Sequence, residues 1–279
     1  MTTEAIWPEI TITVNTWFEL ARDLFVTLSC YENPPSYLFR GQANAKWSLK
    51  PSLLRRLCAV KTRQQHLEIE DWLTKEFFSQ APLYQETASI HTHQGDNRLI
   101  AQWAYMQHHG CATRLLDWTA SAYIAAYFAV CEFPAEPGAV FIVAPGPIDT
   151  YRRRQGLVPE MLTEKDLLSN AGPDCVTFFW PHVRPMRAAT QQSHFSTAVD
   201  LTIPHDAYIL QACRDAQTEH SNDILCKKII IPAALKPAIL QQLYAMNVTP
   251  RSLFPGLDGF GRTLSDLASL KAAKAILSN

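Results

Sequence analysis

The stretch from Tyr37 to Gly41 places the strongest constraint on how this chain can fold. Tyr37, Leu38 and Phe39 favour a β-strand, and the strand delivers one charged side chain, Arg40, at its end. A buried guanidinium without a partner is costly, so Arg40 requires an anion or a carboxylate nearby. Gly41 has no Cβ and therefore permits a turn or a close backbone approach. The stretch predicts either a structural Arg–Asp ion pair or an anion site at the end of a strand.

Composition places the 279-residue chain among globular proteins, because 47% of its residues are hydrophobic and 18% are charged. This length allows one large domain or two small ones, and no internal repeat or convincing linker divides the chain. A net charge of −1 argues against a non-specific polyanion binder, although it leaves room for a local basic patch. The basic triplet 152–154 has no interleaved aromatic residues, so we expect it to be a solvated face.

The seven cysteines are scattered and form neither a CxxC pair nor a cluster with zinc spacing. An odd count of this kind is typical of a reducing compartment. The first residues lack the basic-then-apolar pattern of a signal peptide, and no run approaches the roughly 18 apolar residues of a spanning helix. We therefore expect a cytoplasmic protein with no bound metal and no membrane partner.

Apolar periodicity and turn signals predict a mixed α+β fold, with a β-core decorated by helices. We expect one domain: a helical segment at 1–30, the main body at 31–260 and a C-terminal helix at 261–279 packed on the same body. The expected helices lie at 16–30, 66–81, 97–106, 121–129 and 161–168, and a further helix follows the last expected strand and ends at about 246. The expected strands lie at 37–41, 139–143 and 227–231. In the final helix, Leu264, Leu267 and Leu270 are expected to face inward.

A second polar cluster lies in a turn between apolar anchors, where a rigid scaffold often presents a site. Its candidate residues are His108, His109, Arg114, Asp117, Thr119 and Ser121. Thr119 and Ser121 stand at an expected helix start, so they can bind a phosphate or a carboxamide, or can simply cap the helix. Asp117 can serve a ligand, or it can pair with Arg114 or Arg40.

In an extended segment, the side chains of the two adjacent histidines would point to opposite faces. Only one of His108 and His109 can then enter a site, and no third ligand for a metal accompanies them.

Two motifs in these stretches resemble the signatures of the FRG-domain family. Residues 39–42 (FRGQ), with 47–49 and 51–55, resemble the opening signature, and residues 107–119 resemble the second, with Ala112 where the family usually has proline. Residues 249–259 resemble the closing signature. The resemblance covers roughly residues 30–260 and implies that a site includes the conserved-motif positions Phe39, Gly41, Gln42 and Trp118 beside the polar residues named above.

A third block, residues 184–196, resembles the family's Arg…Gln-x-Gly-x-Phe element. Gln191 and Phe195 match it, and Ser193 replaces the usual glycine. A glutamine has no basicity, so Gln191 can position a water or an amide but cannot act as a general base.

The order of these elements is similar, at the level of fold, to the Arg, Ser-Thr-Ser and Glu elements of one branch of the ADP-ribosyltransferases. The similarity implies a catalytic set of Arg40 on the NAD phosphates, Thr119 and Ser121 on the nicotinamide side, and Gln191 where the family has Glu. It implies NAD as a substrate, and transferase or NAD glycohydrolase chemistry, in an effector of bacterial toxin or antiphage type. The alternative is a non-catalytic module that binds a nucleotide, a phage component or a protein.

These interpretations lead to one geometric expectation, that Arg40, Arg114, Asp117 and Gln191 converge on one cleft. A carboxylate such as Asp200 or Glu219 in the same cleft would favour the enzyme over the binding module. A nuclease is disfavoured because the sequence has no acidic cluster for Mg²⁺. We expect a protein or nucleic-acid target whose identity stays open, as does the oligomeric state.

Overall fold

A seven-stranded sheet forms the centre of the protein, as seen in a computed structural model that describes residues 7, 9–11, 16–25, 37–84, 98–156, 163–170, 172, 175–179, 186–219 and 225–277. The strands are β1 (Glu9–Thr11), β2 (Leu38–Gln42), β3 (Leu116–Thr119), β4 (Gly138–Val143), β5 (Val176–Phe179), β6 (Ser193–Ala198) and β7 (Cys226–Ile231). Their order is β1-β7-β4-β2-β3-β6-β5, antiparallel except for the parallel pair β1 and β7. The expected mixed α+β class is confirmed.

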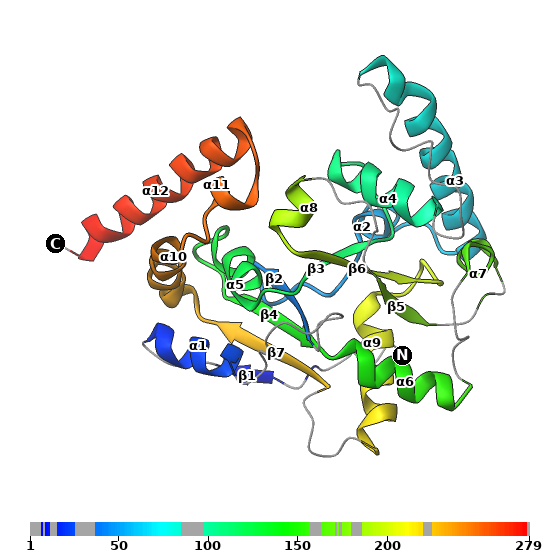
Figure 1. The fold of residues 1–279 in the computed structure, drawn as a ribbon, viewed down its shortest axis with the longest axis horizontal. Helices are drawn as coiled ribbons and strands as arrows, with labels where there is room; N and C mark the ends of the chain where they lie inside the picture. The colour runs from blue at the N-terminus through cyan, green and yellow to red at the C-terminus, as the bar shows by residue number, and fades with distance from the viewer. Residues whose placement is uncertain are drawn as a thin grey trace.

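Helices cover both faces of this sheet (Figure 1). The first six are α1 (Trp17–Phe25), α2 (Ser52–Arg56), α3 (Arg63–Gln80), α4 (Arg98–His108), α5 (Ala122–Val130) and α6 (Pro145–Arg154). The others are α7 (Glu164–Leu168), α8 (Met186–Thr190), α9 (His205–Gln217), α10 (Lys236–Ala245), α11 (Pro250–Leu253) and α12 (Leu257–Leu277), with short 3₁₀ turns at Ala81–Leu83 and Ala233–Leu235.

The two faces of the sheet bury separate apolar clusters because side chains alternate along each strand. Phe39 of β2 packs with α1, α5 and α10 on one face. Leu38, its neighbour, packs with α6 and α9 on the other. Arg40 therefore shares the Leu38 face, and β2 lies in the middle of the sheet between β4 and β3.

Most of the expected elements are present, and their ends differ by a few residues. The strands expected at 37–41, 139–143 and 227–231 are β2, β4 and β7, and Ser121 caps α5 by accepting a hydrogen bond from the Ile124 amide at 3.4 Å. The first expected helix is α1, whose predicted continuation to residue 30 lies outside the described residues, as does Asn97 at the start of α4. The division into three segments stays a prediction.

The expected inner face of the last helix is right for Leu270, which is partly buried against the core, and wrong for the other two leucines. Leu264 and Leu267 are exposed on α12, and the buried side chain between them in the helical turn is Asp266. Its carboxylate accepts hydrogen bonds from the hydroxyls of Tyr127, at 3.1 Å, and Tyr244, at 3.0 Å. These two bonds attach α12 to α5 and α10, so a polar contact, not a leucine stripe, determines which side of the helix faces the body.

The basic triplet is also only partly a solvated face. Arg153 and Arg154 are exposed at the end of α6, and Arg154 pairs with Glu219 at 2.8 Å. Arg152 is buried, because it lies one turn after the buried Ile148 and so shares the inner side of α6.

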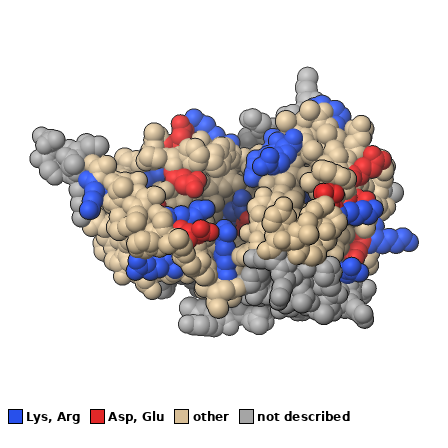
Figure 2. Space-filling view, turned by 90° about the horizontal axis from the view of Figure 1, so that it is seen from above, with Lys and Arg blue, Asp and Glu red and all other residues tan. Residues whose placement is uncertain are grey.

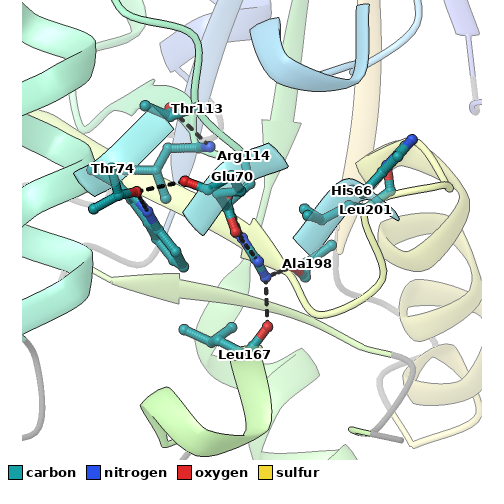
Figure 3. Close-up of polar contacts among 10 residues, drawn as sticks. His66, Glu70, Thr74, Thr113, Arg114, Leu167, Ala198 and Leu201 are labelled. Atoms are coloured by element: carbon teal, nitrogen blue, oxygen red, sulfur yellow. Dashed lines mark hydrogen bonds and ion pairs between the residues drawn. The ribbon is translucent and has the colours of Figure 1, made fainter. Parts of the chain in front are cut away.

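Arg114 is the most heavily bonded charged side chain of the interior (Figure 3). Its Nε donates to both carboxylate oxygens of Glu70 on α3, at 2.8 and 3.0 Å, and its Nη2 donates to Glu70 as well. Its Nη1 donates to the carbonyls of Leu167, at 3.0 Å, and Ala198, at 3.3 Å. The guanidinium also lies over the Trp103 ring of α4. One side chain thus joins α3, α4, α7 and β6.

Replacing Glu70 with alanine should strongly destabilise the fold, because Arg114 would remain buried without its partner. We expect a loss of about 3–5 kcal/mol in the free energy of unfolding, measured by urea denaturation. Glu68→Ala, on the exposed side of the same helix, is the matched control and should change this free energy by less than about 0.5 kcal/mol. Equal losses for the two variants would show that the buried pair is not a special constraint.

Gly41 is required by the packing of β2 on α5. A Cβ at this position would lie 1.9 Å from the Ala125 carbonyl oxygen and 2.8 Å from the Ala129 amide nitrogen. Gly41→Ala should therefore separate the strand from the helix and give a protein that fails to fold or melts far below the wild type. Gly146→Ala has open space for its Cβ and should melt normally. A normal melting temperature for Gly41→Ala would contradict the close packing.

Candidate functional site

A pocket of about 570 Å³ lies at the end of β2, lined by the segment that follows the strand, the end of α5 and one residue of α12. Its charged lining residues are Arg40, Lys46, Lys50, Arg55, Glu132 and Arg262. The five basic side chains outnumber the one acidic side chain, so the pocket is electropositive. Figure 2 shows basic side chains gathered in and around the hollow in the middle of one face.

Arg40 combines a fixed position with an open hydrogen-bonding edge. Its Nη1 donates to the backbone carbonyl of Asp117, across the β2–β3 pair. Its Nε is buried and has no acceptor among the described residues. Burial lowers the pKa of Arg40, the carboxylate of Asp117 raises it, and the charge of Arg55 lowers it. Burial thus outweighs the attraction of Asp117, and the pKa of Arg40 lies below its ordinary value.

Asp117 lies among three arginines that come from different parts of the chain. Its charge raises the pKa of Arg40, of Arg55 on α2 and of Arg187 on α8, while burial lowers all three. Its Oδ1 accepts a hydrogen bond of 2.8 Å from Nε2 of Gln107, which fixes the carboxylate. One carboxylate among three guanidinium groups leaves a net positive charge.

Arg187 of α8 and Arg262, which lines the pocket, extend this positive region. Each lies over the ring of Phe254, with 4.6 Å from the guanidinium carbon to the ring centre. The ring holds the two side chains in place by cation–π contacts. Because the two charges repel, Arg262 further lowers the pKa of Arg187.

Gln42 lies two residues beyond Arg40 on the same face of β2 and lines the same pocket. It is only 7% exposed, and its Oε1 has no hydrogen-bond donor among the described residues. Leaving a buried amide oxygen unsatisfied costs about 1–3 kcal/mol. Gln42 is thus a second polar group in the pocket without a protein partner.

The hydroxyls expected at the nicotinamide side bond to the protein itself. Thr119 donates through Oγ1 to the backbone carbonyl of Gln191, at 2.8 Å, and accepts from the Ser121 amide, at 3.0 Å. Ser121 caps α5. The side-chain Nε2 of Gln191 donates to the carbonyl of Leu253, at 3.1 Å. Gln191, in the turn before β6, and Thr119, at the end of β3, therefore lie together, but neither lines the pocket.

The remaining motif residues also have structural placements. Phe39 is in the core, Gly41 packs on α5, and Trp118 is buried with its Nε1 donating to Oγ of Ser196 at 2.8 Å. His109 is exposed beside Tyr105, with ring centres 4.5 Å apart. The pKa of His108 is lowered by burial, then by His109 and then by Arg187 of the arginine cluster.

The expected convergence on one cleft is therefore corrected. Arg40 and Asp117 come together, whereas Arg114 is fully buried against Glu70 and Gln191 bonds to Leu253. The expected pairing of Asp117 with Arg114 is wrong, because Glu70 takes that place.

The carboxylates considered for the cleft are also elsewhere. Asp200 accepts from Thr202, and Glu219 pairs with Arg154. Glu132 is the acidic residue that lines the pocket.

The residues that sequence reasoning missed are Arg55, Arg187 and Arg262. Arg55 ends the opening motif and Arg187 lies in the block at 184–196, so each had a local signal, whereas Arg262 carries none, because only the tertiary fold brings α12 to the pocket. Within the described residues, no cluster of three or more His, Cys, Asp or Glu side chains is arranged to hold a metal. Searching the same residues finds no helix with the length and apolar character needed to cross a membrane.

Comparison with known proteins identifies one family. Residues 35–136 match the FRG domain, which confirms that part of the expected resemblance. The match contains β2, the Asp117 motif and α5, and it ends before Arg187, Gln191 and Arg262. No curated protein and no solved structure matches the chain. An ADP-ribosyltransferase-like fold is thus not shown.

Replacing Asp117 with asparagine should strengthen anion binding without disturbing the fold. The Asn Oδ1 can still accept from Gln107, and the backbone carbonyl that holds Arg40 is unchanged, so the melting temperature should stay near that of the wild type. Affinity for inorganic pyrophosphate, measured by calorimetric titration, should rise about two- to tenfold, up to about 1.4 kcal/mol.

The gain should shrink at high salt, because exposed charges are screened. Asp71→Asn, on an exposed part of α3, serves as the control. Weaker pyrophosphate binding by Asp117→Asn would show that the carboxylate does not oppose an anion in this pocket.

Proposed function

From the FRG domain at residues 35–136 and the basic pocket at its centre, we propose that this protein binds a nucleotide through the phosphates. NAD is the candidate that the family resemblance suggests. The protein acts in this proposal as a binding module rather than as a transferase.

The observation that carries the proposal is the open edge of Arg40. Its Nη1 is bonded to the Asp117 carbonyl, while its Nε has no acceptor among the described residues. In a guanidinium, Nε and Nη2 together form the planar fork that binds a phosphate or a carboxylate by two parallel hydrogen bonds. The backbone contact fixes the fork in place before a ligand arrives, which lowers the entropy cost of binding.

The size and the lining of the pocket fit a nucleotide. A volume of about 570 Å³ lies within the usual range for small-molecule sites, about 300–1,000 Å³. Five basic side chains can balance a pyrophosphate, and Trp47, which is 46% exposed, offers an aromatic face for a base. A metal-independent anion site of this kind needs no acidic cluster.

The contacts of the other motif residues favour binding over group transfer. Thr119, Ser121 and Gln191 each bond to the protein and none of them lines the pocket, which argues against their holding the nicotinamide side of NAD there. A second candidate, ADP-ribosyl transfer or NAD hydrolysis, has one supporting observation, the exposed Glu132 carboxylate in the pocket lining. A role in toxin action or antiphage defence stays a prediction of the resemblance.

Replacing Arg40 with lysine tests the proposal, because lysine keeps the charge and loses the fork. We expect a near-normal melting temperature and an affinity for ADP and NAD that is weaker by about tenfold or more, about 1.4 kcal/mol or above. Calorimetric titration and a thermal melt on the same sample measure both. Arg153→Lys, on exposed α6, should bind as the wild type does.

Two outcomes would overturn the proposal. A wild-type protein without affinity for pyrophosphate, ADP or NAD has no phosphate site in this pocket. Unchanged ADP binding by Arg40→Lys would show that the fork is not used. Release of nicotinamide from NAD, absent in the binding module, would instead support the second candidate, and Glu132→Gln should then abolish that release while leaving NAD bound.

A further inference from the structure

Gln42 has a buried carboxamide that the fold does not use. The side chain is 93% buried and lines the pocket, yet its Oε1 meets no donor in the described part of the chain. Buried polar groups in folded proteins are nearly always hydrogen-bonded, so an orphaned one at a pocket wall indicates a partner that comes from outside the chain. No side chain that lines the pocket donates a hydrogen bond to this oxygen.

The placement of Gln42 relative to Arg40 defines what that partner is. Side chains two residues apart on a strand point to the same face and stand about 7 Å apart. The two positions also differ in chemistry, because the fork of Arg40 selects an anion and the carboxamide of Gln42 selects a neutral group that donates a hydrogen bond. In a nucleotide, the ribose hydroxyls and the base follow the phosphate at this spacing and supply such donors.

We infer that Gln42 is a specificity-determining residue, which binds the nucleoside part of the ligand and so selects a nucleotide over inorganic phosphate or pyrophosphate. This inference rests on the proposed phosphate site at Arg40. Trp47, exposed at the same pocket, offers a ring on which a base can stack beyond the sugar. The pocket then divides into a cationic half for phosphates and a half that contains Gln42 and Trp47 for the nucleoside.

Gln42→Leu tests this division, because leucine has a similar volume and no hydrogen-bonding group. The affinity for ADP and the affinity for inorganic pyrophosphate are measured side by side at one ionic strength. For the variant we expect an ADP affinity about tenfold lower than that of the wild type and an unchanged pyrophosphate affinity. Its melting temperature without ligand should equal or exceed that of the wild type, because an unsatisfied polar group has been removed.

That combined result separates recognition from a structural role, since a structural glutamine would lower the melting temperature when replaced. Gln241→Leu, at an exposed position of α10 outside the pocket, is the matched control and should change neither affinity. If Gln42→Leu does not fold, Gln42→Met gives the same comparison with an unbranched side chain.

The outcomes also distinguish this inference from the proposed function. A wild type that binds neither ligand removes the phosphate site and the inference with it. A wild type that binds pyrophosphate as tightly as ADP keeps the phosphate site and overturns the role of Gln42. An equal loss of both affinities in the variant, or a lower melting temperature with unchanged ADP affinity, overturns it as well.

Discussion

The ion pair between Arg114 and Glu70 is the interaction on which the arrangement of this protein depends. It is buried, and one guanidinium meets α3, two backbone carbonyls and an aromatic ring of α4. The free-energy cost of desolvating two charges is offset by their attraction only when the geometry is good and the remaining protons are hydrogen-bonded. Both conditions hold for Arg114 and Glu70. Arg114 is followed by the buried Leu115 and by Leu116, where β3 begins. The contact of Arg114 with Glu70 therefore also fixes the position of Asp117 beside Arg40.

Two arginines of the motifs therefore have opposite roles. Arg114 is satisfied by the protein, and its removal from water is balanced internally. Arg40 bonds to one backbone carbonyl, and its Nε has no acceptor in the part of the chain that the structure describes. The residues next to each arginine in the sequence do not distinguish the two roles. Each arginine has an apolar neighbour, and each has an acidic side chain that it could pair with. Only the position of Glu70, 44 residues before Arg114, separates them.

The sequence predicts well whatever depends on local backbone preferences. The strand at Leu38, the cap at Ser121 and the close approach at Gly41 each follow from a residue and its immediate neighbours, and the structure contains all three. It predicts poorly what depends on contacts between distant segments. Leucine spacing placed Leu264 and Leu267 of α12 inside, whereas the buried side is the one with Asp266, which two tyrosine hydroxyls bind. The charge cluster needed Arg187 and Arg262, which no local pattern connects to β2.

The boundary of the FRG match passes through the wall of the pocket. Arg40, Gln42, Arg55 and Asp117 lie inside residues 35–136, whereas Arg262 comes from α12, anchored through Asp266 to α5. All the residues that line the pocket, apart from Arg262, thus lie within one stretch of chain. Under the proposed function, a protein that shares this stretch but continues differently after residue 136 would keep Arg40 and Gln42 and exchange only the rim position that Arg262 occupies, so that the C-terminal half can adjust the charge of the pocket without altering its other contacts.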